Sequence, residues 1–184
     1  MILVYFFIIL ICLLVPIFVI IFFLAQIVAH FTTQAPFVPI PDKIILDIVR
    51  SLHLNNASIL YDLGCGDGRV LKEAVKSNPN IRAVGIEKAL IPYLLARWNI
   101  RKSKNVEIRQ EDIFTTDISD STVIFFYLFP GVPDKLITAF EKRCKPGVRV
   151  VSCDFDCKDR KPTEVIDLDN LNSKRGKKLF VYAI

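Results

Sequence analysis

The first 41 residues contain no Asp, Glu, Lys or Arg, although the 184-residue chain carries 24 basic and 19 acidic side chains. Asp42 and Lys43 are the first charged residues, and Met1 to Ala25 has no strongly polar residue either. The mean hydropathy of +0.41 therefore comes mostly from this N-terminal stretch. The remainder has the composition and length of one soluble domain of ordinary size.

The uncharged stretch is long enough to form a membrane-spanning helix. About 25 helical residues rise roughly 37 Å, whereas the hydrocarbon core of a bilayer is about 30 Å thick. A cleaved signal peptide has a basic n-region and a shorter apolar core, and a buried helix is rarely apolar on all sides over such a length. We therefore expect a transmembrane helix over residues 1–29, in which Pro16 is tolerated. Because Lys43 and Arg50 follow it, the positive-inside rule places the next domain on the cytoplasmic or equivalent internal side.

Histidine is scarce and cysteine is irregularly spaced, which argues against metal and disulfide chemistry. The chain has two histidines and five cysteines, an odd number that favours a reducing compartment without disulfides. Cys153-x-x-x-Cys157 is too weak a pattern for a metal site, so no metal is expected. The basic residues are scattered apart from a mild cluster at 174–178. This favours a solvated face, or one attracted to anionic lipid head groups, over nucleic-acid binding.

Residues 30–41 connect the apolar helix to the domain expected over residues 42–184. Pro36, Pro39 and Pro41 favour an extended backbone in this connection. Two interpretations remain open from these residues alone. The connection is either a stiff spacer that holds the domain off the bilayer or a strap over the active site that carries Phe37.

From Asp42 onward, short apolar runs alternate with segments of helical periodicity, which predicts an α/β fold. We expect a Rossmann-like doubly wound sheet, mostly parallel, with an antiparallel C-terminal edge formed by a closing hairpin. The expected helices cover residues 42–54, 70–77, 90–101 and 134–144, and the expected strands cover 57–61, 81–87, 106–110, 122–129, 148–155, 164–168 and 178–184.

The segment Tyr61–Val70 (YDLGCGDGRV) indicates a strand, a glycine-rich turn and a helix start. Glycine permits positive φ and leaves no Cβ in the way of a ligand, and a helix N-terminus offers unpaired N–H groups. Such a turn cradles a polar or anionic part of a cofactor. The glycines stand at every second position, so the third comes too early for the dinucleotide pattern G-x-G-x-x-G.

Acidic residues at the ends of successive strands narrow the cofactor further. Glu87 can accept hydrogen bonds from both ribose hydroxyls, Asp112 can accept one from the adenine amino group, and Ile113 can pack on the ring. Asp62 can orient an ammonium group. A ligand with an amino-acid end, a ribose and an adenine is S-adenosylmethionine. We expect it to be bound by Asp62, Gly64, Cys65, Gly66, Asp67, Gly68, Glu87, Asp112 and Ile113.

The pattern D-x-G-x-G-x-G, an acid after the second strand and E-D-I after the third resembles the class I seven-stranded methyltransferases. A single N-terminal span, Pro36–Pro39 and Gly85–Glu87 are further similar to the membrane-anchored mitochondrial protein lysine methyltransferases. These act on the ATP synthase c subunit and the adenine nucleotide translocase. The resemblance covers about residues 30–184. It implies that Phe37, Val38 and Pro39 belong to a segment needed for activity.

The chain departs from that family at Lys88–Leu90, where the family has an asparagine-proline-containing stretch, and it has no Arg- and Ser-rich presequence. A prokaryotic plasma membrane is therefore the expected location, with the mitochondrial inner membrane as the alternative. We expect Tyr127 to act in catalysis and Phe37, Pro39 and Phe129 to bind substrate. The aromatic residues of the expected strand 122–129 could equally belong to the hydrophobic core.

The expected function is methyl transfer to a lysine of an integral membrane protein. Nucleic-acid amine methyltransferases of this fold carry an acid or asparagine, Pro-Pro and an aromatic residue where this chain has Tyr127–Pro130, which argues against N6-adenine methylation. Two alternatives stay open: a lipid or quinone methyltransferase, and a membrane-tethered factor that binds the cofactor without turnover.

Overall fold

A computed structural model describes residues 2–32, 38–168 and 175–184, and side chains from residue 3 to 25 within the first of these ranges. Phe37 and Lys174 lie outside the described residues. The chain divides into two compact units, residues 1–36 and 37–184.

The first unit contains the long helix α1 (Ile2–Thr32). Its segment Leu3–Ala25 has a mean hydropathy of 3.5, and none of that segment is buried within the protein. Among the described residues this is the one helix long and apolar enough to cross a membrane. The length and composition of this helix suit a membrane anchor and equally a signal sequence near an N-terminus.

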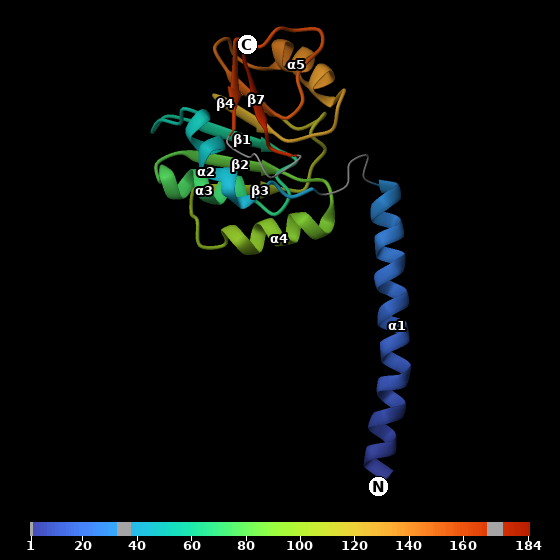
Figure 1. Cartoon of the computed structure of the whole chain (residues 1–184). Helices are drawn as coiled ribbons and strands as arrows, with labels where there is room; N and C mark the ends of the chain where they lie inside the picture. Colours follow the sequence, from blue (N-terminus) through green and yellow to red (C-terminus); the bar gives the residue numbers. More distant parts are fainter. Residues whose placement is uncertain (1, 33–37, 169–174) are drawn as a thin grey trace. The chain divides into compact units, whose positions relative to one another are not determined.

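The second unit is built on a seven-stranded sheet with the order β3-β2-β1-β4-β5-β7-β6 (Figure 1). The first five strands are parallel, and β7 runs antiparallel to both β5 and β6. The strands are β1 (Ile59–Leu63), β2 (Arg82–Ile86), β3 (Val106–Arg109), β4 (Val123–Phe126), β5 (Arg149–Cys153), β6 (Glu164–Asp167) and β7 (Lys178–Ala183). The predicted fold class, with its antiparallel C-terminal edge, is confirmed.

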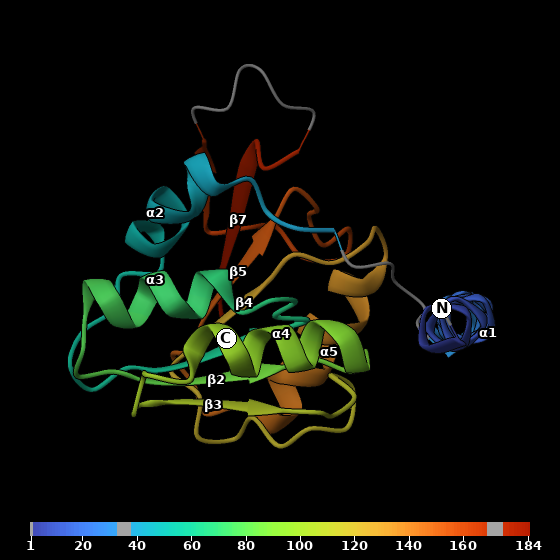
Figure 2. The same ribbon diagram turned by 90° about the horizontal axis from the view of Figure 1, so that it is seen from below.

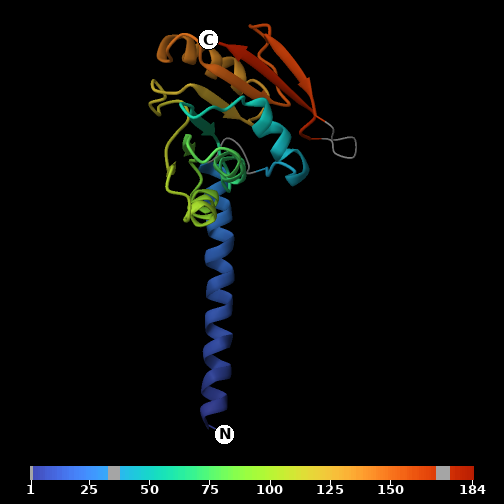
Figure 3. The ribbon, with the colours of Figure 1, turned by 90° about the vertical axis from the view of Figure 1, so that its left-hand side faces the viewer.

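Helices cover both faces of this sheet. The helices are α2 (Asp42–Ser51), α3 (Arg69–Ser77), α4 (Leu90–Ile100) and α5 (Val132–Arg143). Apolar side chains of α2 and α3, with Ala96 of α4, form one core with residues such as Leu60 and Val151. Those of α5 form a second core with Tyr61 and Phe126. Figures 2 and 3 show α3 and α4 side by side with nearly parallel axes.

Two strands end earlier than the sequence pattern predicts. The apolar run 122–129 pairs as β4 only to Phe126, and the run 148–155 pairs as β5 only to Cys153. Asp154 directly follows β5 and has a positive φ of 65°, and the segment after β4 reaches a turn at Gly131, where φ is 80°. Consequently Tyr127, Asp154 and Phe155 lie beyond the strands, at the carboxyl edge of the sheet, rather than inside the ladder.

Candidate functional site

The carboxyl ends of β1 to β5 lie on one edge of the sheet, because these five strands are parallel. In open α/β sheets this is the edge at which ligands bind. The glycine turn follows β1, Glu87 follows β2, Asp112 follows β3 by three residues and Tyr127 follows β4. Asp62 is the exception, since it lies inside β1 and its side chain is buried beneath this edge.

The glycine turn is fixed by backbone hydrogen bonds. The N–H groups of Gly64 and Cys65 both donate to the carbonyl oxygen of Ile86, at 2.8 and 3.0 Å, and Gly68 N donates to Cys65 O at 2.9 Å. Gly64, Gly66 and Gly68 have φ values of 78°, 58° and 77°. These are left-handed backbone conformations, which residues with a Cβ adopt only at an energetic cost. The backbone path of the turn therefore requires glycine at these positions. The Cys65 thiol is buried in the core, and its backbone N–H and carbonyl are both used within the turn.

Glu87 closes the turn from the neighbouring strand. Its Oε2 accepts a hydrogen bond from Gly66 N at 3.0 Å, and its Oε1 accepts one from Ala89 N at 2.8 Å. Burial raises the pKa of this carboxyl, while the two N–H donors act in the opposite direction. Each carboxylate oxygen retains lone pairs that a pair of ribose hydroxyls could use.

Asp62 carries a buried oxygen without a partner. The side chain is 2% exposed, and Oδ2 has no hydrogen bond to any residue that the structure describes. Burial, together with the negative charges of Glu87 and Asp67, raises the pKa of Asp62 to about 8. A buried polar group without a partner is costly and marks a position where a ligand supplies the missing donor.

Asp67 holds an arginine that the sequence pattern did not single out. Its carboxylate receives Arg69 Nη2 at 2.6 Å, and Arg69 Nη1 donates to Ile40 O at 2.8 Å and to Asp42 Oδ1 at 2.9 Å. Asp67 thus acts within the protein, tying the glycine turn to the start of α2. Arg69 could have been suspected from its place directly after the third glycine, but its partners could not.

The end of β3 supplies Asp112 and Ile113, as the sequence predicts. Asp112 Oδ1 accepts a hydrogen bond from Phe114 N at 2.9 Å, and Oδ2 pairs with Lys88 Nζ at 3.1 Å. These contacts hold the pKa of Asp112 below its usual value. Ile113 is half-buried against the second core. Lys88 therefore forms an ion pair with Asp112 within the domain. It stands at a position where the chain departs from the mitochondrial pattern.

An aromatic pair lies at the ends of β4 and β5. The rings of Tyr127 and Phe155 stack with centroids 6.5 Å apart and planes 10° from parallel. Burial and the neighbouring Asp154 carboxylate raise the pKa of Tyr127 to about 12, so its hydroxyl keeps its proton at neutral pH. Phe129 is exposed, as is Pro39 on the segment before α2.

Asp154 and Phe155 were missed by the sequence analysis, which placed both inside a strand. Asp154 accepts hydrogen bonds from Gly176 N at 2.5 Å and Lys177 N at 2.6 Å, and so joins the end of β5 to the approach to β7. The carboxylate beside the aromatic pair is therefore held in place by the backbone of another segment. An acid directly after an apolar run was the available signal for this position.

Gly85 has a packing role that spacing could not reveal. A Cβ at this position would lie 2.6 Å from Leu71 Cδ1, 2.7 Å from Ile108 Cδ1 and 2.8 Å from Cys65 Sγ. All three distances are shorter than side-chain contacts allow. The absence of a side chain lets α3 and the glycine turn pack directly on β2.

Gly85→Ala is expected to lower the free energy of unfolding by about 1–3 kcal/mol, the usual range for overpacking a core. Chemical denaturation of the variant and the parent protein measures this. Lys161→Ala, at an exposed position away from the core, is the control and should change the free energy of unfolding by no more than about 0.5 kcal/mol. A Gly85→Ala protein as stable as the parent would contradict the packing assignment.

These residues fit S-adenosylmethionine. An unpartnered buried carboxylate suits the ammonium group of its amino-acid end, and the glycine turn admits close backbone approach. Glu87 presents two acceptor oxygens directly after β2. Strand β2 pairs with β3, which is the strand that precedes Asp112. No group of three or more potential metal ligands occurs within the described ranges.

A seven-stranded sheet of this order, with this turn and these acids on its carboxyl edge, defines an S-adenosylmethionine-dependent methyltransferase. A family model described as the ANTKMT methyltransferase domain matches residues 62–164, more than half of the chain. The chain belongs to this family, which confirms the resemblance drawn from the motifs.

Individual relatives agree with this membership. A protein-lysine N-methyltransferase of Saccharolobus islandicus is 34% identical over 154 residues, covering 82% of this chain and 96% of the relative. A lysine N-methyltransferase of the ATP synthase c subunit from Caenorhabditis elegans is 32% identical over 100 residues, which are 49% of this chain and 52% of that protein. A crystal structure of an RNA methyltransferase from Salinibacter ruber with S-adenosyl-L-homocysteine superposes with a TM-score of 0.72 at 34% identity, covering 80% of this chain and 94% of that one.

Proposed function

We propose that this protein is a membrane-anchored protein-lysine N-methyltransferase whose substrate is a membrane protein. The observation that carries the proposal is the near full-length similarity to a protein-lysine N-methyltransferase, 34% identical and 96% covered. The apolar segment Leu3–Ala25 supports the anchor, since its 23 residues suffice to span a bilayer. The catalytic domain then faces the cytoplasmic or equivalent internal side, and tag accessibility at the C-terminus tests this orientation.

The geometry of the carboxyl edge supports the following cofactor roles in this proposal. Asp62 receives the ammonium group, Glu87 receives the ribose hydroxyls, and Asp112 with Ile113 receives the adenine. The glycine turn and Asp67 shape the space between them. S-adenosylmethionine, when bound, would supply a methyl group on a sulfonium, from which the neutral thioether S-adenosylhomocysteine is a good leaving group. The protein then has to align and desolvate the acceptor nitrogen.

The acceptor side is formed by residues at the ends of β4 and β5. A lysine amine has an unperturbed pKa of about 10.4 and must lose a proton before it can attack. Apolar surroundings such as the stacked rings of Tyr127 and Phe155 disfavour the charged ammonium and lower its pKa. The Tyr127 hydroxyl stays protonated and does not act as a base. Its oxygen accepts a hydrogen bond from an N–H of the amine, which leaves the nitrogen lone pair free to attack. Pro39 and Phe129 complete the substrate side. Phe37, assigned with them, lies outside the described residues.

Tyr127→Phe is expected to lower kcat about 2- to 12-fold, because one hydrogen bond contributes about 0.5–1.5 kcal/mol. The affinity for S-adenosylhomocysteine should stay within about twofold, since the ring stacking remains. Turnover assays and calorimetry measure the two quantities. Tyr93→Phe, on α4, is the control and should change neither. An unchanged kcat in Tyr127→Phe would remove this residue from the mechanism.

The substrate class is tested by incubating the full-length protein with methyl-labelled cofactor and membranes and RNA from its own cells. A labelled protein band, with the mark mapped to lysine by mass spectrometry, supports the proposal. Label confined to the lipid extract supports a lipid or quinone methyltransferase, and label in RNA supports the activity for which the Salinibacter relative is described. Cofactor binding without any transfer would leave a non-catalytic tethered factor.

A further inference from the structure

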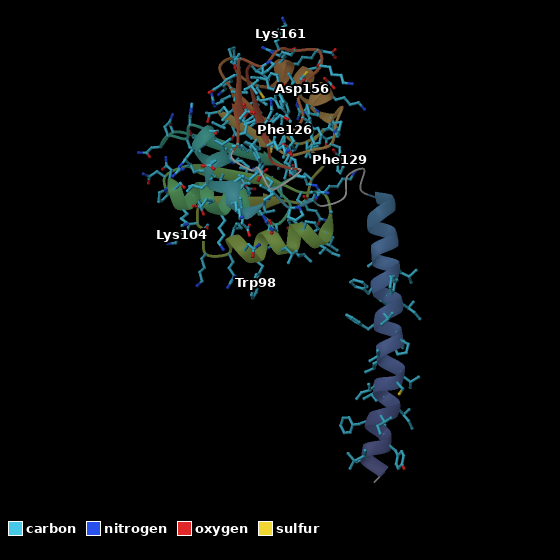
Figure 4. All side chains as sticks on the ribbon, in the orientation of Figure 1. Trp98, Lys104, Phe126, Phe129, Asp156 and Lys161 are labelled. Carbon is cyan, nitrogen blue, oxygen red and sulfur yellow. The ribbon has the colours of Figure 1, made fainter. Side chains whose placement is uncertain are left out.

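Helix α4 exposes an unusual apolar face. Outside α1, most of the exposed large apolar side chains of the described residues belong to this helix, and Trp98 is the most exposed of them at 65%. Figure 4 shows Trp98 pointing away from the body of the domain, on the side opposite Lys161. The apolar face consists of Leu90, Ile91, Leu94, Leu95 and Trp98.

The apolar face is opposite to the side that packs on the domain. The buried residues of α4 are Pro92, Ala96 and Ile100, one stripe at intervals of four. Each residue turns an α-helix by about 100°, so the exposed apolar residues centre roughly 170° away from this stripe. A surface helix ordinarily carries polar residues there. Burial within the domain therefore does not account for the apolar face of α4.

Basic residues border this face. Arg97 on α4, and Arg101, Lys102 and Lys104 just beyond it, are all exposed, and no acidic residue lies between Lys88 and Lys104 in the sequence. The Arg101 guanidinium lies over the Trp98 ring, 4.1 Å from its centroid. An apolar stripe with tryptophan and flanking Lys and Arg is the composition of helices that lie in a membrane interface.

We propose that α4 docks on the membrane surface, with its apolar face at the boundary between head groups and acyl chains and its basic residues on anionic lipid. This rests on the proposed anchor, which keeps the domain at high effective concentration near one bilayer. Tryptophan favours this interface, and each basic residue is attracted by the negative surface potential. The charge pattern favours lipid over a second copy of the chain, whose α4 would bring the same positive charges together.

Docking of α4 would hold the site close to the bilayer. The helix begins three residues after Glu87, so its N-terminus adjoins the carboxyl edge of the sheet. Lysines of membrane proteins extend their amines to the same interface. The helix would thus act as a second attachment point that limits the substrates to lysines near the head groups.

The test uses Trp98, which is the chain's single tryptophan. Full-length protein is reconstituted in vesicles of phosphatidylcholine and phosphatidylserine, with or without bromine on the acyl carbons nearest the head group. Docking predicts that bromolipid lowers the Trp98 emission about twofold or more and that acrylamide quenching falls by a similar factor, because the indole lies in the interface. High salt should partly reverse both effects.

Flotation of the same samples after alkaline extraction separates the two proposals. Protein that does not float refutes the anchor, and the docking that rests on it falls as well. Protein that floats while Trp98 remains open to acrylamide and untouched by bromolipid refutes the docking alone. An indole shielded from acrylamide but not quenched by bromolipid also refutes it, in favour of a protein contact on this face.

A charge-reversal pair provides an independent check. Lys102→Glu with Lys104→Glu should reduce bromolipid quenching to near the level without bromine, while leaving flotation unchanged. Lys142→Glu with Lys161→Glu reverses two exposed charges elsewhere on the domain and should leave the quenching unchanged. Equal quenching in both double variants would overturn the role given to the basic border of α4.

Discussion

Glu87→Ala is expected to weaken S-adenosylmethionine binding about 100-fold. Hydrogen bonds to a charged acceptor contribute about 1.5–3 kcal/mol each, and 1.4 kcal/mol corresponds to a factor of ten. The carboxylate also accepts the N–H of Gly66 at 3.0 Å, so its removal releases the turn that shapes the site. The substitution therefore removes a carboxylate that both the cofactor and the glycine turn use. Calorimetric titration with S-adenosylhomocysteine measures the loss.

Two variants make this result interpretable. Glu107→Ala removes an exposed acid on β3 whose partners are Arg109 and Arg82, and it should leave the affinity within about twofold. Glu87→Gln retains an oxygen acceptor without the charge and should fall between Glu87→Ala and the parent. Undiminished affinity in Glu87→Ala would contradict the assignment of the carboxyl edge as the cofactor site.

Asp62→Asn is expected to weaken cofactor binding and, at the same time, to stabilise the protein at alkaline pH. The ionised carboxylate is the form that suits an ammonium group, and the buried Oδ2 has no partner among the described residues to offset its charge. Asparagine removes the attraction for the ligand and also the cost of burying a charge. Binding should fall about tenfold or more, and the free energy of unfolding above pH 8 should rise by about 1–3 kcal/mol.

The pH dependence of these effects follows from the pKa of about 8, which lies above the ordinary aspartate value. Between about pH 4 and pH 8 the folded protein binds more protons at this site than the unfolded chain does. Stability therefore falls as the pH rises through this range and levels off above it. The advantage of Asp62→Asn should shrink as the pH is lowered from about 9 to about 5.

Cofactor affinity should change with pH in the opposite direction. Below pH 8 the free protein has to release the Asp62 proton when an ammonium group binds, so the affinity rises by up to about tenfold per pH unit until it levels off. Titrations in two buffers of different ionisation enthalpy count the released protons. The ligand's own amine titrates equally with both proteins, so Asp62→Asn serves as the control. Identical pH profiles would show that Asp62 does not ionise on binding.

The order of helices and strands was predictable because each element carries its signal locally. Alternation of apolar runs with periodic segments predicts β and α elements, and the glycine turn fixes the point where β1 passes into α3. The ends of β4 and β5 were less predictable. Apolar residues continue past β4 as Tyr127–Phe129, although the pairing stops at Phe126, and β5 stops just before Asp154, which has a positive φ.

The residue pattern indicates the class of cofactor, since Asp62, the three glycines, Glu87 and Asp112 stand at positions that a parallel sheet must bring to one edge. It also determined that an apolar segment long enough to span a bilayer precedes this domain. These inferences rest on spacing along the chain, which local geometry converts directly into position.

Contacts between distant segments are set by the tertiary structure and not by spacing along the chain. It left one oxygen of Asp62 without a partner, placed Leu71, Ile108 and Cys65 around Gly85, and stacked Phe155 on Tyr127. It also decided which side of α4 faces the domain. Helical periodicity assigns the residues of a helix to its faces, but only packing determines which face is covered. In α4 the covered face is a narrow stripe, and the exposed face is apolar.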